Sequence, residues 1–345
     1  MKIVLDGMGG DYSPDEVVKG AVKAAAEIEE TIVIVGPEGK IKECLEANKW
    51  SGNNIEIVDA TEVITNEEHP AMAIRKKKDS TIVKGMNMLK NGEADIFISG
   101  GSTGALLSGG LTILGRIKGI KRPAIAAWFP RAGKKGVTLL LDCGASVEAK
   151  SEYLHQYGIM GDIFVRGITG KIAPTVRLLN VGTEEGKGDT LHKEAFDLLK
   201  NSYVNFCGNV EARDVIYGDT DIVVMDGFSG NVYLKASEGM ASAIMGLFKN
   251  KLTEGIKAKF GAMLAYSKIK DIKNTFDYSD AGGAPILGLK GAVLKVHGNS
   301  RSVEFYYAIH RAVDYVKSDI TGKIRDTIEK TEAEKADTPE SGADE

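Results

Sequence analysis

The sequence predicts an α/β protein whose mostly parallel sheet is covered by helices on both faces, a three-layer α/β/α arrangement. Short β-branched segments alternate with helix patterns along most of the 345 residues, as parallel sheets require. Several of these segments are almost continuously apolar, which is typical of strands buried on both faces. Glycine, with 41 residues, exceeds its usual share of about 7%, and this excess favours loops that turn tightly or approach a ligand.

The predicted elements follow one another in a regular order. Strands are expected at residues 3–6, 31–35, 55–59, 95–99, 124–129, 137–142, 176–181, 221–226 and 292–297. Helices are expected at residues 14–29, 80–90, 103–114, 148–165, 189–200, 231–250 and 302–317. The first helix illustrates the reasoning, because Ser13 and Pro14 suit its first positions and Val17, Val18 and Ala21 share one face.

Size and charge narrow the class of protein. The 345 residues equal about two average domains, and the uninterrupted pattern predicts a catalytic α/β/α domain over residues 1–330. Residues 331–345 contain six acidic residues and one lysine and are expected to form a disordered tail. With 44 basic and 48 acidic residues, no overall basic field favours nucleic acid as a partner.

Cysteine and histidine usage predicts a reducing compartment without a metal centre. The three cysteines are far apart, and together with the lack of a signal-peptide pattern they indicate a cytoplasmic protein. The five histidines show no metal-ligand spacing, so no metal is expected, and no other cofactor is predicted for the chain. Cys143 follows a strand and could carry an acyl group, although a buried structural thiol is the simpler interpretation.

Glycine-rich turns follow four of the predicted strands. The first turn, at residues 6–11, begins like a dinucleotide-binding fingerprint, but Tyr12 stands where the last glycine belongs. A nicotinamide site is therefore only weakly indicated, and a tight turn before the helix is the simpler interpretation.

The second turn directly precedes a predicted helix and consists of Gly100, Gly101, Ser102, Thr103 and Gly104. Unpaired amides at a helix start and the helix dipole both favour an anion, so a phosphate-binding site is predicted here. Two alternatives stay open, a plain turn and the G-x-S-x-G nucleophile elbow of serine hydrolases. In the second alternative Ser102 is the nucleophile, followed along the chain by Asp226 and His297.

Three polar side chains at predicted strand ends are candidates for catalysis. Lys187 lies in a loop resembling a P-loop that is one residue short and has Gly188 where a metal-binding hydroxyl belongs. Its ammonium suits a phosphate or a developing oxyanion, and a solvated loop lysine is the alternative. Asn231 either polarises a carbonyl or caps the helix that it opens. His297 either transfers a proton or is structural.

The segment 251–273 differs from a core helix. It contains six lysines and two acidic residues around an apolar face with helical spacing, formed by Leu252, Ile256, Phe260, Met263 and Leu264. A basic amphipathic segment in an acidic protein is typical of a contact with a membrane surface or an acidic partner. A dimer interface and ordinary core packing are the alternatives.

Several of these motifs together resemble one family. Residues 1–14, 100–107, 209–214, 218–239 and 282–291 closely resemble, in unbroken order, the bacterial acyl-carrier-protein:phosphate acyltransferases of phospholipid synthesis. The resemblance implies transfer of a fatty acyl group from the thioester of acyl carrier protein to inorganic phosphate, giving acyl-phosphate. It also implies a fold like that of isocitrate and isopropylmalate dehydrogenases and phosphate acetyltransferase.

The same resemblance implies partners and a place in the cell. It suggests a cytoplasmic homodimer, peripherally associated with the membrane, whose product is used by a membrane-bound glycerol-3-phosphate acyltransferase. Within the shared motifs, further substrate-binding residues are expected at Asp6, Gly9, Gly10, Asp226 and Ser229. Two other functions stay open: a serine esterase using Ser102, and a non-catalytic anion-binding module that docks on membranes.

Overall fold

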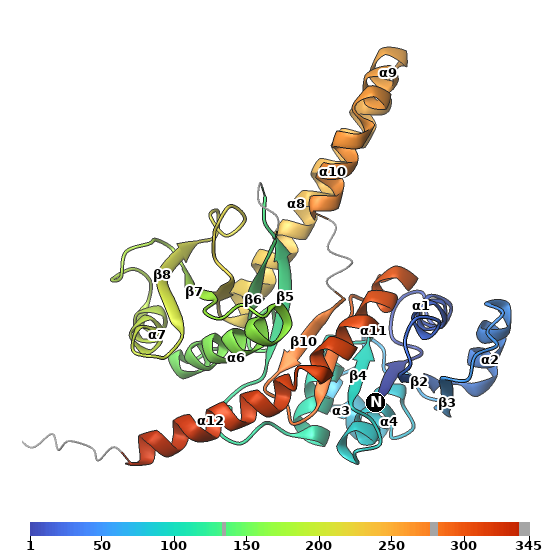
Figure 1. Ribbon diagram of the computed structural model, residues 1–345, viewed down its shortest axis with the longest axis horizontal. Coiled ribbons are helices and arrows are strands. Elements are labelled where there is room, and N and C mark those ends of the chain that lie inside the picture. The colour runs from blue at the N-terminus through green and yellow to red at the C-terminus, as the bar shows by residue number, and fades with distance from the viewer. Residues whose placement is uncertain (133–135, 277–281, 338–345) are drawn as a thin grey trace, which may run out of the picture. The chain divides into compact units, whose positions relative to one another are not determined.

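The computed structural model describes residues 1–132, 136–276 and 282–337, with the side chains of 273–276 and 334–337 left aside (Figure 1). Contacts divide the chain into two compact units. The first comprises Met1–Pro123, Ile163–Ile172 and Gly283–Glu345, and the second comprises Ala124–Asp162 and Ala173–Gly282. Each unit contains hydrogen-bonded strands and buried apolar residues, and the single catalytic domain over residues 1–330 stays a prediction.

The first unit contains a mostly parallel sheet in the order β3-β2-β1-β4-β11-β10. Its neighbouring strands run parallel, except that β10 is antiparallel to β11. The strands are β1 (Lys2–Asp6), β2 (Thr31–Gly36), β3 (Ile55–Asp59), β4 (Ile96–Ser99), β10 (Ala284–Leu287) and β11 (Ala292–Lys295). Leu5 in the buried centre pairs with Ile34 and Ile98, as expected for strands covered on both faces.

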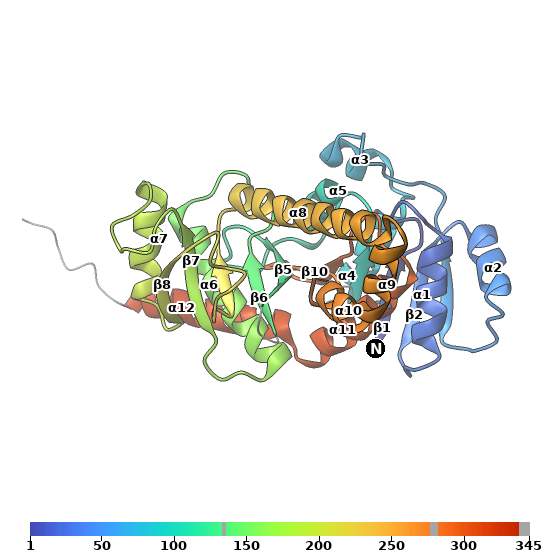
Figure 2. The same cartoon turned by 90° about the horizontal axis from the view of Figure 1, so that it is seen from above.

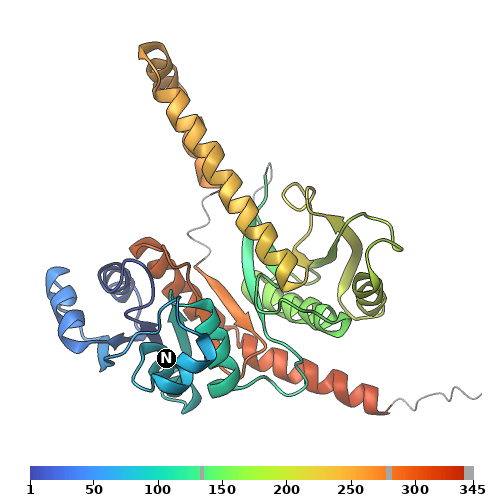
Figure 3. The same ribbon diagram turned by 180° about the vertical axis from the view of Figure 1, so that it is seen from behind.

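Helices cover both faces of this sheet (Figures 1 and 3). Close approach uses glycines: a Cβ on Gly20 of α1 would meet Phe305 of α11 at 2.7 Å, and Gly85 of α4 packs on Phe97 of β4. The helices are α1 (Asp15–Ala25), α2 (Glu38–Ala47), α3 (Pro70–Lys76), α4 (Thr81–Lys90), α5 (Thr103–Gly109), the π-helical turn η1 (Gly110–Leu114), α11 (Ser302–Lys317) and α12 (Ile320–Asp337).

The second unit contains a five-stranded sheet in the order β5-β6-β9-β7-β8. Only the β5–β6 pair is antiparallel. The strands are β5 (Ala124–Pro130), β6 (Val137–Leu141), β7 (Thr175–Asn180), β8 (Asn205–Glu211) and β9 (Ile222–Val224). The helices are the part of α6 (Ser151–Thr169) up to Asp162, α7 (Thr190–Lys200), α8 (Gly227–Thr253), α9 (Ile256–Leu264) and α10 (Tyr266–Phe276).

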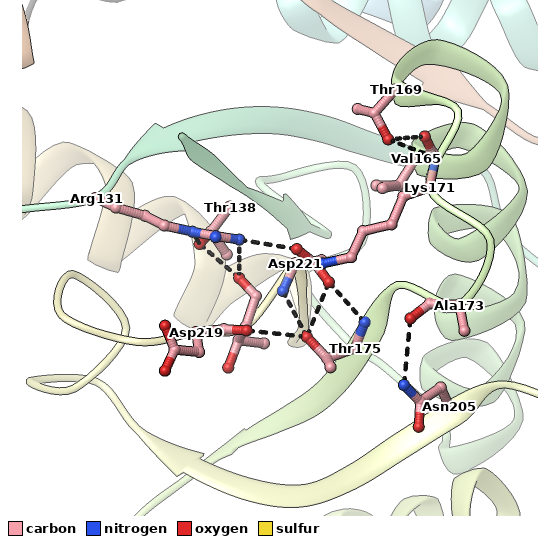
Figure 4. Close-up of polar contacts among 11 residues, drawn as sticks. Arg131, Thr138, Val165, Thr169, Lys171, Ala173, Thr175, Asn205, Asp219 and Asp221 are labelled. Carbon is pink, nitrogen blue, oxygen red and sulfur yellow. Dashed lines mark hydrogen bonds and ion pairs between the residues drawn. The ribbon is translucent and has the colours of Figure 1, made fainter. Parts of the chain in front are cut away.

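A buried ion pair fixes the amino-terminal end of this second sheet (Figure 4). Arg131 Nη2 lies 3.1 Å from Asp221 Oδ1 and donates to Thr220 O at 2.6 Å. Asp221 Oδ2 accepts the Thr175 amide at 2.8 Å, and Thr138 Oγ1 donates to Thr220 O at 2.8 Å. The network joins β5, β6 and β7 to the residues before β9, at the opposite end from the candidate site.

Some predicted boundaries are wrong. Asn231 does not open its helix, because α8 starts at Gly227 and the Asp226 carboxylate caps it by accepting the Ser229 amide at 2.9 Å. Helix α12 continues to Asp337, so residues 331–337 are helical rather than disordered, since Glu, Lys and Ala are strong helix formers. Residues 338–345 of the expected tail lie outside the described residues.

The apolar face expected over residues 251–273 is divided between elements. Gly255 has φ of 85° and separates α8, which contains Leu252, from α9, because this backbone conformation ends a helix. Ile256, Phe260, Met263 and Leu264 are all exposed on α9, so ordinary core packing is wrong for them. Figure 2 shows α8 as one long helix, and α9 lies at its far end (Figure 3).

None of the described helices combines the length and the low polarity needed to cross a bilayer.

Candidate functional site

The first unit brings several predicted site residues together at the carboxyl ends of β1, β4 and β11. A Cβ on Gly100 would lie 2.6 Å from Gly9 O, so the two glycine-rich turns touch through their backbones. The Asp11 amide donates to Gly298 O at 2.8 Å, which joins the segment after His297 to the first turn. Ligands of open α/β sheets bind at this edge.

The Asp6 side chain, at the end of β1, holds these turns together through hydrogen bonds. It is buried, and its carboxylate accepts Ser99 Oγ at 2.6 Å and the Met8 amide at 3.1 Å. Ser99 Oγ in turn accepts the Gly101 amide at 2.9 Å. Burial raises the pKa of Asp6, against the lowering effect of the Ser99 hydrogen bond. These contacts hold the turns in place, and they also mean that the Gly101 amide already has an acceptor.

The helix start after Gly101 is the remaining part of the predicted phosphate site. Ser102 is the N-cap of α5, and its side chain makes no capping hydrogen bond there among the described residues. Helix α5 continues directly into η1, so Thr103 and Gly104 contribute amides to the start of a longer helical run. A Cβ on Gly104 would lie 2.7 Å from Pro70 of α3, which explains the glycine.

A cation that the sequence interpretation missed lies beside this helix start. Lys295, the last residue of β11, donates from Nζ to Gly100 O at 3.4 Å and contacts Val296 O. The sequence feature that could have indicated Lys295 is its position two residues before His297, which follows the same strand. His297 is exposed, and its Nδ1 accepts the Asn299 amide at 3.3 Å.

The second unit has its own cluster at the carboxyl ends of β6 and β9, built around Asp142. This fully buried carboxylate accepts the amides of Gly144 at 3.1 Å, Ala145 at 3.0 Å and Ser146 at 2.8 Å. It also accepts the Ile125 amide at 2.9 Å. Burial raises the pKa of Asp142 to about 6 despite these amides. Sequence reasoning missed this residue, which organises the whole 143–146 turn.

The start of α8 packs directly on that turn. A Cβ on Gly227 would lie 2.5 Å from Asp142 Oδ2, and a Cβ on Gly230 would lie still closer to Asp142 O. Asn231 is exposed, and its Nδ2 lies 2.7 Å from where a Cβ on Gly144 would stand. Because Asp226 is the cap, the Asn231 amide is not needed to start the helix, and the capping alternative for Asn231 is wrong.

Lys187 lies in the loop between β7 and α7 of the same unit. The side chain is exposed, and its stem lies against Gly182, where a Cβ would stand 3.0 Å from Lys187 Cγ. Asn180 and Asn209 donate to carbonyl groups of this loop. Lys187 is therefore a lysine on a well-defined loop.

Cys143 is unsuited to covalent catalysis. Its thiol is buried and donates to Leu140 O at 3.6 Å. Burial, with the nearby Asp142 charge, raises the pKa of Cys143 far above its ordinary value. The structural interpretation of this thiol therefore fits better than an acyl-cysteine.

The family model described as a fatty acid synthesis protein matches residues 1–323. A phosphate acyltransferase from Clostridium novyi (strain NT) is 46% identical over 330 residues, which cover 95% of this chain and 99% of the relative. One from Clostridium acetobutylicum is 46% identical over 332 residues, with the same coverage. The chain belongs to the phosphate acyltransferase family. The enzyme is thus an acyltransferase, and neither a serine esterase nor a non-catalytic module is favoured.

A solved structure supports the fold of this phosphate acyltransferase. A phosphotransacetylase from Streptococcus pyogenes matches with a TM-score of 0.62 and 17% identity, covering 92% of this chain and 94% of that one. At that identity the likeness shows the fold alone. It agrees with the mixed α/β class and the mostly parallel sheets expected from the sequence.

Proposed function

We propose that the enzyme transfers a fatty acyl group from the thioester of acyl carrier protein to inorganic phosphate, for phospholipid synthesis. A phosphate oxygen attacks the thioester carbonyl carbon, the carbon–sulfur bond breaks, and the proton of hydrogen phosphate ends on the released thiol. The products are acyl-phosphate and carrier protein. The observation that carries this proposal is the match of nearly the whole chain to phosphate acyltransferases.

The first unit supports a phosphate-binding role. Phosphate is anionic at neutral pH, so a site needs mainly to hold it in line with the carbonyl. The amides at Ser102, Thr103 and Gly104 and the ammonium of Lys295 beside Gly100 suit this anion. We assign His297, at the same edge, to positioning phosphate or protonating the thiol.

The second unit supports stabilisation of the tetrahedral intermediate. Asn231 and Lys187 are an amide and an ammonium at the carboxyl edge of its sheet, and both are exposed. Donors held in place before reaction stabilise a developing oxyanion most strongly. We keep Gly9, Gly10 and Ser229 as proposed substrate-binding residues, whereas Asp6 and Asp226 are engaged in holding turns and a helix cap.

We further propose that the enzyme is a cytoplasmic homodimer and that α9 of each copy contacts the membrane surface. Phe260 and Ile256 are exposed beside Lys257 and Lys259, which suits an anionic bilayer surface. Acyl-phosphate is amphipathic, so release at a bilayer suits delivery to a membrane-bound glycerol-3-phosphate acyltransferase. We also keep a fold of the isocitrate and isopropylmalate dehydrogenase type as a proposal, which rests on the resemblance of the sequence motifs.

The test is incubation of acyl carrier protein thioester with radiolabelled phosphate. We expect a labelled acyl-phosphate, trapped by hydroxylamine as a hydroxamate, with one free carrier thiol for each product. Free fatty acid without labelled product, together with labelling by a fluorophosphonate, would instead indicate a serine esterase. Phosphate binding without any turnover would indicate a non-catalytic module.

A further inference from the structure

The loop that carries Lys187 is held by two amide side chains from neighbouring strands. Asn180, the last residue of β7, donates from Nδ2 to Lys187 O at 3.1 Å. Asn209 of β8 donates from Nδ2 to Glu184 O at 2.8 Å. The Lys187 amide closes the turn by donating to Glu184 O at 3.2 Å. The first and the last carbonyl of the turn are thus bound to side chains of the sheet.

Two glycines of this exposed loop, Gly182 and Gly188, lie closely against side chains on either side of the turn. A Cβ on Gly182 would lie 2.9 Å from Glu184 Oε2, and the Lys187 stem lies against the same glycine. Gly188, with φ of 92°, leaves only 2.7 Å between its Cβ position and Asn180 Oδ1. Asn180 Oδ1 itself accepts the Val181 amide at 2.8 Å. The direction in which the lysine leaves the loop is therefore determined by contacts on both sides.

The burial of Asn209 has a cost that its hydrogen bond to Glu184 O does not explain. Only 1% of the residue is exposed, and within the described part of the chain its Oδ1 has no hydrogen-bond partner. A desolvated, unpaired carbonyl opposes folding. An apolar residue at this position would avoid that cost but would release Glu184 O. The placement therefore favours a positioning function over a purely stabilising one.

We propose that Asn180 and Asn209 are positioning residues for Lys187, acting as a clamp that presents its ammonium at a fixed place on the carboxyl edge of the second sheet. This inference rests on the proposed function, in which Lys187 stabilises a developing oxyanion. An ammonium on a loose loop would have to be ordered during the reaction, and a fixed one avoids that reorganisation.

The experiment combines amide exchange with a double-mutant cycle. In Asn180→Ala and Asn209→Ala we expect exchange of the Lys187 amide to increase about tenfold or more, as local opening becomes easier. We expect kcat for acyl-phosphate formation to fall about tenfold with KM changed less than about twofold. In a Lys187→Ala background the same substitutions should lower kcat no further, because their effect passes through the lysine.

Matched variants separate positioning from folding. Asn205→Ala removes a comparable bond, from Asn205 Nδ2 to Ala173 O at 3.3 Å, at the other end of β8 (Figure 4), and should leave kcat unchanged. Asn180→Asp keeps the acceptor for Val181 but replaces the donor to Lys187 O with a charged oxygen that repels this carbonyl, so it should lower kcat at least as much as Asn180→Ala. If Asn209→Ala does not fold, Gly182→Ala displaces the Lys187 stem instead and should show the same dependence on the lysine.

The outcomes are distinct. Unchanged exchange, or equal losses of kcat with and without Lys187, would overturn the clamp. Clamp variants with wild-type rates while Lys187→Ala is impaired would overturn the clamp and leave the proposed function in place. Wild-type turnover by Lys187→Ala would remove the lysine from the chemistry and overturn both assignments for it.

Discussion

Asn231 lies against Gly144, with its amide nitrogen 2.7 Å from the position that a Cβ on residue 144 would occupy. Gly144 also has φ of 127°, so only glycine suits both the backbone and the space. The Asp142 carboxylate holds this turn through its amides. The second turn of α8 and the turn after β6 thus determine together where the Asn231 amide points.

Gly144→Ala should therefore displace Asn231 and lower kcat about a hundredfold, since small misplacements of reacting groups have effects of that order. The measurement is acyl-phosphate formation by folded protein, with circular dichroism as the check of folding. Gly170→Ala is the matched control, because Gly170 has φ of 71° and nothing within 4 Å of its Cβ position. Equal activity in the two variants would mean that the contact with Asn231 does not matter.

Asn231→Ala and Lys187→Ala should each lower kcat by about 10²–10³ while the protein stays folded, as removal of an oxyanion donor does. Both side chains are exposed, so their loss leaves no core cavity. The exposed Lys193 of α7 provides a control, and Lys193→Ala should behave as wild type. Wild-type rates in both test variants would remove the two residues from the site.

Much of the fold was predictable because its strands have a simple pattern. The central strands are short, apolar and bounded by glycine, and β1, β2, β3 and β4 lie within a residue of their expected bounds. Strand β8 was missed because Asn205, Gly208 and Asn209 interrupt any apolar pattern. The two-unit division was also not predictable, because the chain passes between units at residues 123–124, 162–163, 172–173 and 282–283 without a linker composition.

The places of Gly100, Lys187 and His297 after strands were predictable, because each follows a recognisable strand segment, and their roles stay predictions. The site was not predictable where function depends on three-dimensional contacts. Asp142 follows β6 without a motif, and its importance is visible only from the amides that surround it. Asn180 and Asn209 are separated along the chain and bind the same loop only because β7 pairs with β8.

Stability should depend on pH through Asp142. Burial raises its pKa from 3.8 to about 6 in the folded protein, so between these values the folded state binds more protons than the unfolded chain. The free energy of unfolding should therefore fall as pH rises through this window and become independent of this group above it. The measurement is urea unfolding across the window. Asp142→Asn should abolish that part of the slope, and an identical slope in both proteins would contradict the raised pKa.

Loss of the Arg131–Asp221 ion pair should destabilise the second unit without altering the chemistry. Arg131→Ala leaves the Asp221 carboxylate buried without this cation, and removing one member of such a pair lowers the free energy of unfolding by about 3 kcal/mol. Adding Asp221→Asn should recover part of the loss, because the variant then no longer buries a carboxylate charge that lacks the Arg131 guanidinium. Arg213, whose side chain is 80% exposed in its pair with Glu211, is the control, and Arg213→Ala should cost less than about 0.5 kcal/mol. Equal effects at the two arginines would show that the buried network adds no stability.

Membrane attachment should depend on the apolar side of α9. Phe260 is 60% exposed on that helix, so its ring is free to insert into a bilayer. Phe260→Glu replaces this ring with a negative charge that an anionic bilayer repels. The variant should no longer float together with vesicles that contain anionic lipid. Its activity on soluble acyl carrier protein thioester should stay at the wild-type level. Ile172→Glu adds the same charge at an apolar residue that is 85% exposed outside these helices, and it should still bind. Unchanged flotation of Phe260→Glu together with a shift from dimer to monomer would instead assign this face of α9 to an interface between two copies of the chain.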